Sequence, residues 1–267
     1  MITNRDYFPT VILGATFAGL GAAYANEESL VMERTSFVGH EFINSFHPGV
    51  GWHETALTEK GMKLKQELME RGVMSDEGSV HIPAVAPILY NKIIQDSLSV
   101  LLQTEVTEIV SAGNSWEVTV YNNSGFRRIK TDRVIDTRPE MAPTELLRSK
   151  SLNALLNCGE EELVLPEEIR GQAHLVKGKL KGEIILKFPV DVKDDWFVSR
   201  QKLHQFWVNR PEAWKAWTIS AISGCFEWRH DQGEPASASP GRVSLPSSAY
   251  RNPLEAFEAG LAAGRGK

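Results

Sequence analysis

Cysteine is scarce in this chain of 267 residues. Its two cysteines, Cys158 and Cys225, do not form a CxxC pair. A disulfide framework or a cysteine-ligated zinc site needs more cysteines than this. Low cysteine use is typical of a reducing compartment, so we expect a cytoplasmic protein.

An excess of positive charge is also absent. The chain has 29 Lys and Arg residues against 34 Asp and Glu residues, which gives a formal net charge of -5. Nucleic acids and anionic membranes attract proteins through basic surfaces, and this balance provides none. We therefore expect neither nucleic acid nor membrane among the partners.

Long hydrophobic runs are missing as well. The apolar stretch from Val11 to Ala25 is shorter than the roughly 20 residues that a membrane-spanning helix needs. Residues 23–25 imitate a signal-peptidase site, but Arg5 and Asp6 cancel where a signal peptide begins with positive charge. We expect no export, and the alternative is an exported protein whose first 25 residues are removed.

The remaining composition, 42% hydrophobic and 24% charged, is that of an ordinary globular protein. This length is enough for one large domain or two closely packed ones. Periodicity and capping signals predict the order of elements along the chain. The expected strands are 10–13, 29–32, 99–103, 116–121, 126–130 and 133–136, and the expected helices follow the turn at 14 and cover 57–71, 83–96 and 253–263.

The sharpest motif follows the first expected strand, with the sequence VILGATFAGLGAA at 11–23. A strand that feeds a glycine turn and a helix start makes an anion site from free backbone N–H groups and the helix dipole. In a dinucleotide fold the glycines allow the tight turn and the close approach of a diphosphate. Gly14 and Gly19 hold the outer glycine positions, and Thr16 replaces the middle one. The Thr16 hydroxyl is a candidate donor to a phosphate oxygen.

An acidic residue stands where the ribose of a dinucleotide would be bound. Glu33 lies 19 positions after Gly14, at the end of the second expected strand. A carboxylate there accepts hydrogen bonds from ribose hydroxyls. The alternative is a small-residue packing unit without a ligand.

Several stretches together resemble the FAD-dependent oxidoreductases of the glutathione-reductase type, especially their FAD-only branch. These stretches are VILGATFAGLGAA, ERTSFVGH, VLLQTEVTEI, the hairpin followed by DRVIDT, and the terminal AYRNPLEAFEAGLAAG. The resemblance implies FAD as cofactor, bound through Gly14, Thr16, Phe17, Ala18, Gly19, Glu33, Arg34, Val106, Asp136, Thr137, Asn252, Pro253 and Leu254. In this family the last helix points its N-terminus at the flavin ring.

The resemblance also implies a fold class and a division into domains. We expect an α/β protein with a Rossmann-like FAD-binding domain, made of a parallel sheet and a β-meander, and a small α+β substrate domain. The FAD-binding domain would comprise 1–137 and 240–267, and the substrate or cap domain 138–239. A loop rich in Pro, Ser, Gly and Ala is expected at 233–248.

The function implied is an oxidoreductase that transfers a hydride between a small organic substrate and bound FAD. A nicotinamide-dependent dehydrogenase that uses the same turn is one alternative, and the terminal NPLEAF helix and the hairpin before DRVIDT argue against it. The sequence has no second GxGxxG motif, so the FAD-dependent protein would have no built-in NAD(P)H site. Another alternative is a non-catalytic or partner-dependent subunit, which Thr16, His40 and Arg138 favour because glycine is usual at those positions. The short substrate region also leaves room for a protein partner that completes the active site.

Three histidines after the ribose-binding strand, His40, His47 and His53, are candidate proton acceptors during substrate oxidation. Solvated loop histidines are the alternative. Their spacing is not that of metal ligands, so no metal site is expected.

Two further features have simpler interpretations. Five tryptophans lie between 196 and 228, and core packing of the second domain explains them better than a substrate pocket. Cys225 has no resolving cysteine nearby, so we interpret it as a buried structural cysteine.

Overall fold

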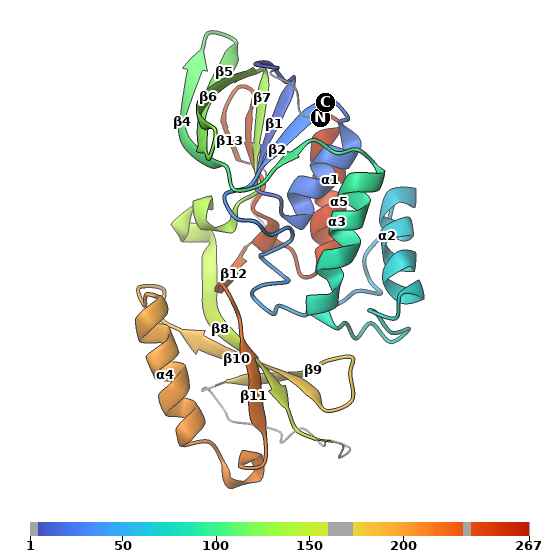
Figure 1. Ribbon diagram of the computed structural model, residues 1–267, viewed down its shortest axis with the longest axis vertical. Helices are drawn as coiled ribbons and strands as arrows, with labels where there is room; N and C mark the ends of the chain where they lie inside the picture. The colour runs from blue at the N-terminus through green and yellow to red at the C-terminus, as the bar shows by residue number, and fades with distance from the viewer. Residues whose placement is uncertain (1–4, 160–172, 232–235, 267) are drawn as a thin grey trace.

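A computed structural model describes residues 5–159, 173–231 and 236–266. The chain forms two bodies that lie end to end (Figure 1). One contains both ends of the described chain, and the other is built from the segment between β7 and β13. The prediction of an α/β protein is confirmed.

A mostly parallel sheet forms the centre of the first body. Its strand order is β13-β14-β7-β1-β2-β3, with parallel pairing throughout except between β13 and β14 at one edge. The strands are β1 Thr10–Leu13, β2 Ser29–Met32, β3 Val100–Leu101, β7 Arg133–Asp136, β13 Ala236–Ser239 and β14 Arg242–Ser244. The loop prediction for 233–248 was wrong at β13 and β14, because strands this short at a sheet edge carry little periodicity.

Helices cover one face of this sheet, and a meander covers the other (Figure 1). The helices are α1 Phe17–Ala25, α2 Glu59–Glu70, α3 Val85–Gln95 and α5 Pro253–Gly264, with the short η1 Ile82–Ala84 before α3. The meander strands are β4 Glu105–Ala112, β5 Ser115–Asn122 and β6 Gly125–Thr131. The expected hairpin and helices are therefore present.

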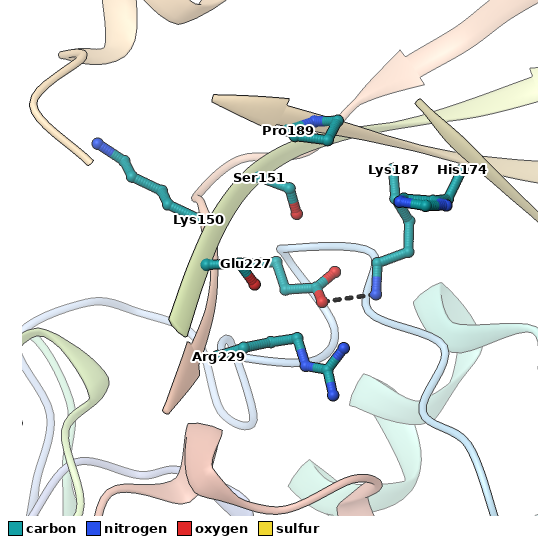
Figure 2. Close-up of a pocket in the computed structure, with 8 residues that line it drawn as sticks. Lys150, Ser151, His174, Lys187, Pro189, Glu227 and Arg229 are labelled. Carbon is teal, nitrogen blue, oxygen red and sulfur yellow. Dashed lines mark ion pairs between the residues drawn. The ribbon is translucent and has the colours of Figure 1, made fainter. Parts of the chain in front are cut away.

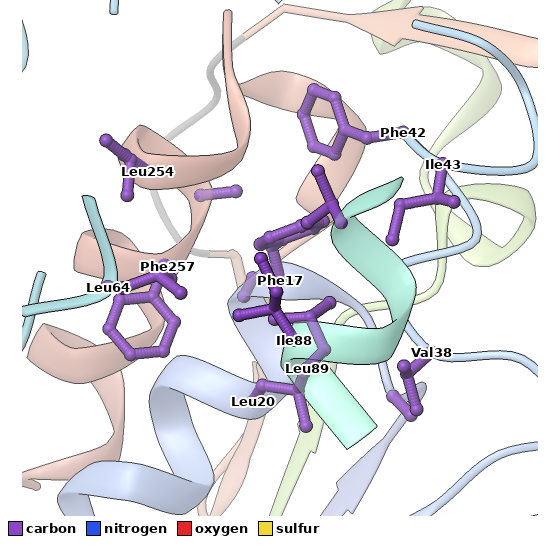
Figure 3. Packing of buried hydrophobic residues seen from close by; sticks show 14 of the residues in the cluster. Phe17, Leu20, Val38, Phe42, Ile43, Leu64, Ile88, Leu89, Leu254 and Phe257 are labelled. Carbon is purple, nitrogen blue, oxygen red and sulfur yellow. The ribbon is translucent and has the colours of Figure 1, made fainter. Parts of the chain in front are cut away.

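Close packing of α1 against α5 holds the two ends of the chain together. A Cβ on Gly260 would overlap the carbonyl oxygen of Ala18, and one on Gly21 would overlap that of Phe257. Only glycine allows backbones to approach this closely. Figure 3 shows the core around this contact, with Phe17 and Phe257 on the two helices.

The second body is a five-stranded antiparallel sheet with one covering helix. Strand β8 is central and pairs with β10, β11 and β12, while β9 pairs with β10. Its elements are β8 Leu147–Asn157, β9 His174–Lys177, β10 Glu183–Val190, α4 Trp196–Val208, η4 Glu212–Trp214, β11 Thr218–Ile222 and β12 Glu227–His230. Of the remaining short helices, η2 Pro139–Met141 and η3 Thr144–Leu146 lie between β7 and β8, and η5 Ser247–Ala249 lies between β14 and α5.

The two faces of this second sheet differ in character. Leu152, Ala154 and Leu156 of β8 join a core with Trp214 and Trp217, whose rings stack at 5.1 Å between centroids. The core-packing interpretation is therefore confirmed for Trp214 and Trp217, whereas Trp228 is not part of this core. Successive side chains of a strand point to opposite faces of the sheet, and those that point to the other face are more polar.

Candidate functional site

The glycine turn joins the end of β1 to the start of α1. Gly14 has φ +95°, a conformation that favours glycine. A Cβ on Gly19 would overlap the carbonyl oxygen of Gly14. The two outer glycines of the motif are therefore required by the backbone, as expected for this motif.

Thr16 at the middle position caps α1. Its hydroxyl accepts a hydrogen bond from Gly19 N at 2.9 Å and donates one to Thr137 Oγ1 at 2.7 Å. Thr137 Oγ1 in turn donates to the carbonyl oxygen of Leu13 at 2.8 Å. The Thr16 hydroxyl thus links the turn to the residue after β7.

Glu33 at the end of β2 faces the glycine turn. Its Oε2 accepts a hydrogen bond from Ala15 N at 3.0 Å, and its Oε1 accepts two from Thr35 at 2.8 Å each. The side chain is 3% exposed. Glu33 therefore holds the turn and the start of the next loop in place.

A cavity of about 240 Å³ opens beside Glu33. It brings together three of the residues expected at the adenosine end of FAD, namely Glu33, Arg34 and Val106. Arg138 also lines it and pairs with Asp136 through two hydrogen bonds of 2.9 and 2.7 Å. Ligand pockets usually measure about 300–1,000 Å³, so this cavity suits part of a dinucleotide.

Two residues that sequence reasoning missed occupy the N–H groups at the start of α1. Glu41 Oε1 accepts a hydrogen bond from Phe17 N at 2.7 Å. Ser247 Oγ accepts one from Ala18 N at 3.3 Å and donates to Glu41 Oε1 at 2.6 Å. An acid directly after Gly39-His40 is the signal that could have drawn attention to Glu41, whereas Ser247 lies in a stretch without a motif.

Asn252 caps the last helix, as its sequence predicts. It accepts a hydrogen bond from Glu255 N at 2.9 Å, and Pro253 and Leu254 after it are buried. The Asn252 amide donates to the carbonyl oxygen of Val50 at 2.9 Å. The loop around Val50 therefore lies against the start of α5.

The three candidate histidines lie in different surroundings. His40 Nδ1 is 3.8 Å from Glu33 Oε2. His53 is exposed and lies next to Gly78. His47 is 7% exposed, and its Nδ1 accepts a hydrogen bond from Gly49 N at 3.1 Å. The structure does not bring the three side chains together.

His47 belongs to a buried polar cluster that joins the two bodies. Glu227 of β12 pairs with Lys187 Nζ at 2.6 Å and accepts a hydrogen bond from Asn153 Nδ2 at 2.7 Å. His47 Nε2 lies 3.7 Å from Glu227, and Asn153 also donates to the carbonyl oxygen of Ser45 at 2.8 Å. Burial lowers the pKa of His47 to about 4, so its imidazole is neutral at pH 7.

A pocket of about 300 Å³ lies on the polar face of the second sheet. In Figure 2 Glu227, Lys187 and Arg229 point toward one region, while Lys150 points away. The lining residues come from four strands and are Ser149, Lys150, Ser151, His174, Lys187, Pro189, Glu227 and Arg229. Lys187 and Arg229 face this region beside the single carboxylate of Glu227 (Figure 2), which favours an anionic ligand.

Cys225 lies near the junction of the two bodies. Its Sγ is 3.4 Å from the carbonyl oxygen of His40. Burial raises the pKa of the thiol to about 12, which fits an unreactive cysteine. Among the described residues, no group of three acidic, histidine or cysteine side chains could hold a metal ion. Within the same residues, no helix has the length and apolarity to cross a membrane.

No known family matches the sequence, and no curated protein does. Solved structures do match the fold. Glycine oxidase from Geobacillus kaustophilus superposes with a TM-score of 0.61 at 12% identity, over 97% of this chain and 94% of that one. The p-nitrophenol 4-monooxygenase from Pseudomonas putida superposes with a TM-score of 0.57 at 11% identity, over 97% and 77% of the two chains.

A complex of aklavinone-11 hydroxylase with FAD and aklavinone also matches, with a TM-score of 0.58 at 10% identity. The match covers 98% of this chain and 61% of that one. This chain has the FAD-binding Rossmann-type fold of flavoenzymes.

The described residues fit FAD unequally along its length. At the adenosine end Glu33, Arg34 and Val106 line an open cavity. At the diphosphate position the N–H group of Phe17 already has a partner in Glu41. The adenosine end of FAD therefore has a cavity to occupy, whereas the diphosphate position is already hydrogen-bonded to a side chain of the chain itself.

Proposed function

We propose that this chain is an FAD-dependent oxidoreductase of the glutathione-reductase type that acts on a small organic substrate. The observation that supports it best is the cavity beside Glu33, whose side chain contacts the glycine turn in which Gly14 has φ +95°. When bound, FAD supplies two-electron redox chemistry by exchanging a hydride with the substrate.

The proposed roles of the chain's own residues follow from where they lie. Glu33 and Arg34 would hold the ribose, and Val106 would contact the adenine. Gly14, Thr16, Phe17, Ala18 and Gly19 would surround the diphosphate, with Asp136 and Thr137 behind it. The start of α5 at Asn252, Pro253 and Leu254 would place its positive end near the flavin ring.

The polar pocket of the second sheet is the proposed substrate site. Glu227 lines this pocket, and His47 lies next to Glu227. Its Lys187 and Arg229 suit an anionic group such as a carboxylate. In the tautomer that accepts from Gly49 N, His47 holds its proton on Nε2, so we assign it to positioning Glu227. The proton-acceptor role of His40 and His53 stays a prediction, because neither lines this pocket.

A second function is favoured by the hydrogen bond between Glu41 and Phe17 N. A chain that keeps its own carboxyl group at the diphosphate position would serve as a non-catalytic subunit with a flavoprotein fold. A protein partner would then supply or complete the active site, and the open pocket on the second sheet is the surface it would use.

Flavin uptake tests the proposed function. The purified chain is incubated with FAD, passed through gel filtration, examined by visible absorption and then denatured to release bound flavin. The wild type and the Glu41→Ala variant are run together. We expect retained flavin in at least the variant, and reduction of that flavin by small carboxylic acids under anaerobic conditions. Colourless protein from both chains would overturn the proposal and favour the non-catalytic subunit.

A further inference from the structure

Glu41 lies inside the first body, at the start of α1. The side chain is 5% exposed, and its Oε1 accepts hydrogen bonds from Phe17 N and from the Ser247 hydroxyl. Free N–H groups at a helix start attract anions, and a dinucleotide fold uses these groups for the diphosphate. Glu41 therefore occupies the place of the cofactor's negative charge.

Two anchors keep the Glu41 side chain in this place. Gly39 N donates a hydrogen bond to the carbonyl oxygen of Ala15 at 2.7 Å, which ties the segment before Glu41 to the glycine turn. Gly39 has φ +61°, and a Cβ there would lie 2.7 Å from the Phe17 ring. Ser247 N donates to the carbonyl oxygen of Thr137 at 3.0 Å, which fixes the second anchor.

The second oxygen of Glu41 is buried and has no hydrogen-bond partner in the part of the chain that the structure describes. Glu33 and Glu227 each have a basic side chain nearby. Within the described residues, Glu41 forms no such salt bridge. A buried carboxyl group that is held by dipoles and leaves one oxygen unsatisfied is poorly compensated. A ligand that offers several phosphate oxygens to the same N–H groups can replace it.

We infer that Glu41 is an internal competitor for the diphosphate of the cofactor, with Ser247 as its clamp. The inference rests on the proposed function, because it concerns binding of FAD to the same turn. Binding of FAD requires the Glu41 carboxyl group to leave Phe17 N. Removal of that group tightens binding, although it removes a native hydrogen bond.

Equilibrium titration with two probes tests the inference. FAD binding is followed by flavin fluorescence, and ADP binding by calorimetry, for wild type, Glu41→Ala and Glu41→Gln. Since a hydrogen bond to a charged group contributes about 1.5–3 kcal/mol, we expect Glu41→Ala to lower the Kd for both probes by about 10- to 100-fold. Glu41→Gln keeps the acceptor oxygen, and we expect a smaller gain.

The matched control is Glu258→Gln. Glu258 Oε1 also accepts hydrogen bonds at a helix start, from Thr58 N at 2.8 Å and Thr58 Oγ1 at 3.0 Å, but this helix is α2. We expect its Kd values to equal those of the wild type. Equal Kd values for wild type, Glu41→Ala and Glu41→Gln, with FAD bound by all three, would overturn the inference and leave the proposed function standing. No binding by any of them would overturn both.

Discussion

Two buried glutamates, one at each functional region, have opposite properties. Glu41 is 5% exposed and Glu227 is 1% exposed. Burial raises the pKa of Glu41. Burial also acts to raise the pKa of Glu227, but the facing His47 and Lys187 bring it below its usual range.

This difference in environment indicates a different role for each carboxyl group. Glu227 has a cation at 2.6 Å and an amide at 2.7 Å, so it is a fixed link between β12, β10 and β8. Among the described residues, Glu41 has an N–H group and a hydroxyl as hydrogen-bond partners and one unsatisfied oxygen, and the neighbouring His40 acts on it electrostatically. A carboxyl group held in this way is the one that a ligand can displace.

The largest expected effect comes from Glu227→Ala. It leaves the Lys187 ammonium and the Asn153 amide without their partner, and breaking a buried ion pair costs about 3–5 kcal/mol. We expect a loss of this size in the free energy of unfolding, measured by urea denaturation. The control is Glu59→Ala, which removes an exposed pair with Lys63 and should leave stability unchanged. Equal stability of the two variants would contradict the structural role of Glu227.

Local sequence patterns predicted most elements of the fold and some residues of the candidate site. Gly14, Gly19, Glu33 and Asn252 are identified by spacing and capping, because their roles depend on neighbours in the same element or the next one. The extents of the strands at 10–13, 29–32 and 133–136 agree with the structure.

Other parts of the site depend on contacts between distant segments. Glu41 and Ser247 are separated by 206 positions, and Asn153 and Glu227 by 74. No periodicity or motif relates residues so far apart, and their meeting depends on how α1, η5 and the second sheet pack. The glycine motif predicts an anion site at the turn, but no local pattern indicates that the Glu41 carboxyl group lies against it.

Acidification should weaken the Glu227 region. The pKa of His47 is about 4 in the folded chain against 6.5 when unperturbed, so the unfolded chain binds more protons between these values. Stability is then lost as pH falls through this window, by about 3 kcal/mol. Unfolding curves between pH 7 and 4 measure the slope, which His47→Gln should flatten.

The Glu41 region should respond to pH with the opposite sign. The pKa of Glu41 is raised, so the folded chain holds the proton longer than the unfolded chain does. The contribution of Glu41 to the free energy of unfolding therefore falls as the pH rises from the ordinary pKa of a glutamate through the raised pKa of Glu41. We expect Glu41→Gln to remove this loss at neutral pH, and an unchanged pH profile would count against burial of an ionisable group there.

We expect Glu41→Ala to lower the stability of the ligand-free chain and to raise its affinity for FAD. Without ligand, Phe17 N and the Ser247 hydroxyl lose their acceptor, which costs about 1–3 kcal/mol. With saturating FAD, the loss should be recovered because the cofactor binds only the folded chain. Thermal unfolding with and without FAD measures both, and a variant that FAD stabilises less than the wild type would refute this trade.

The smallest effect should come from Ser247→Ala. It removes one hydrogen bond to Glu41 at 2.6 Å, worth about 1 kcal/mol, and should tighten FAD binding by only a few-fold. Ser248→Ala is its neighbouring control, because Ser248 contacts His230 instead. The same titration should find no change in the control.

A crystal structure of the Glu41→Ala variant grown with FAD tests the central claim most directly. The account predicts a diphosphate hydrogen-bonded to the N–H groups of Phe17 and Ala18, with the adenosine in the cavity beside Glu33. A flavin bound elsewhere on the chain, or a turn that stays closed around other side chains, would contradict it.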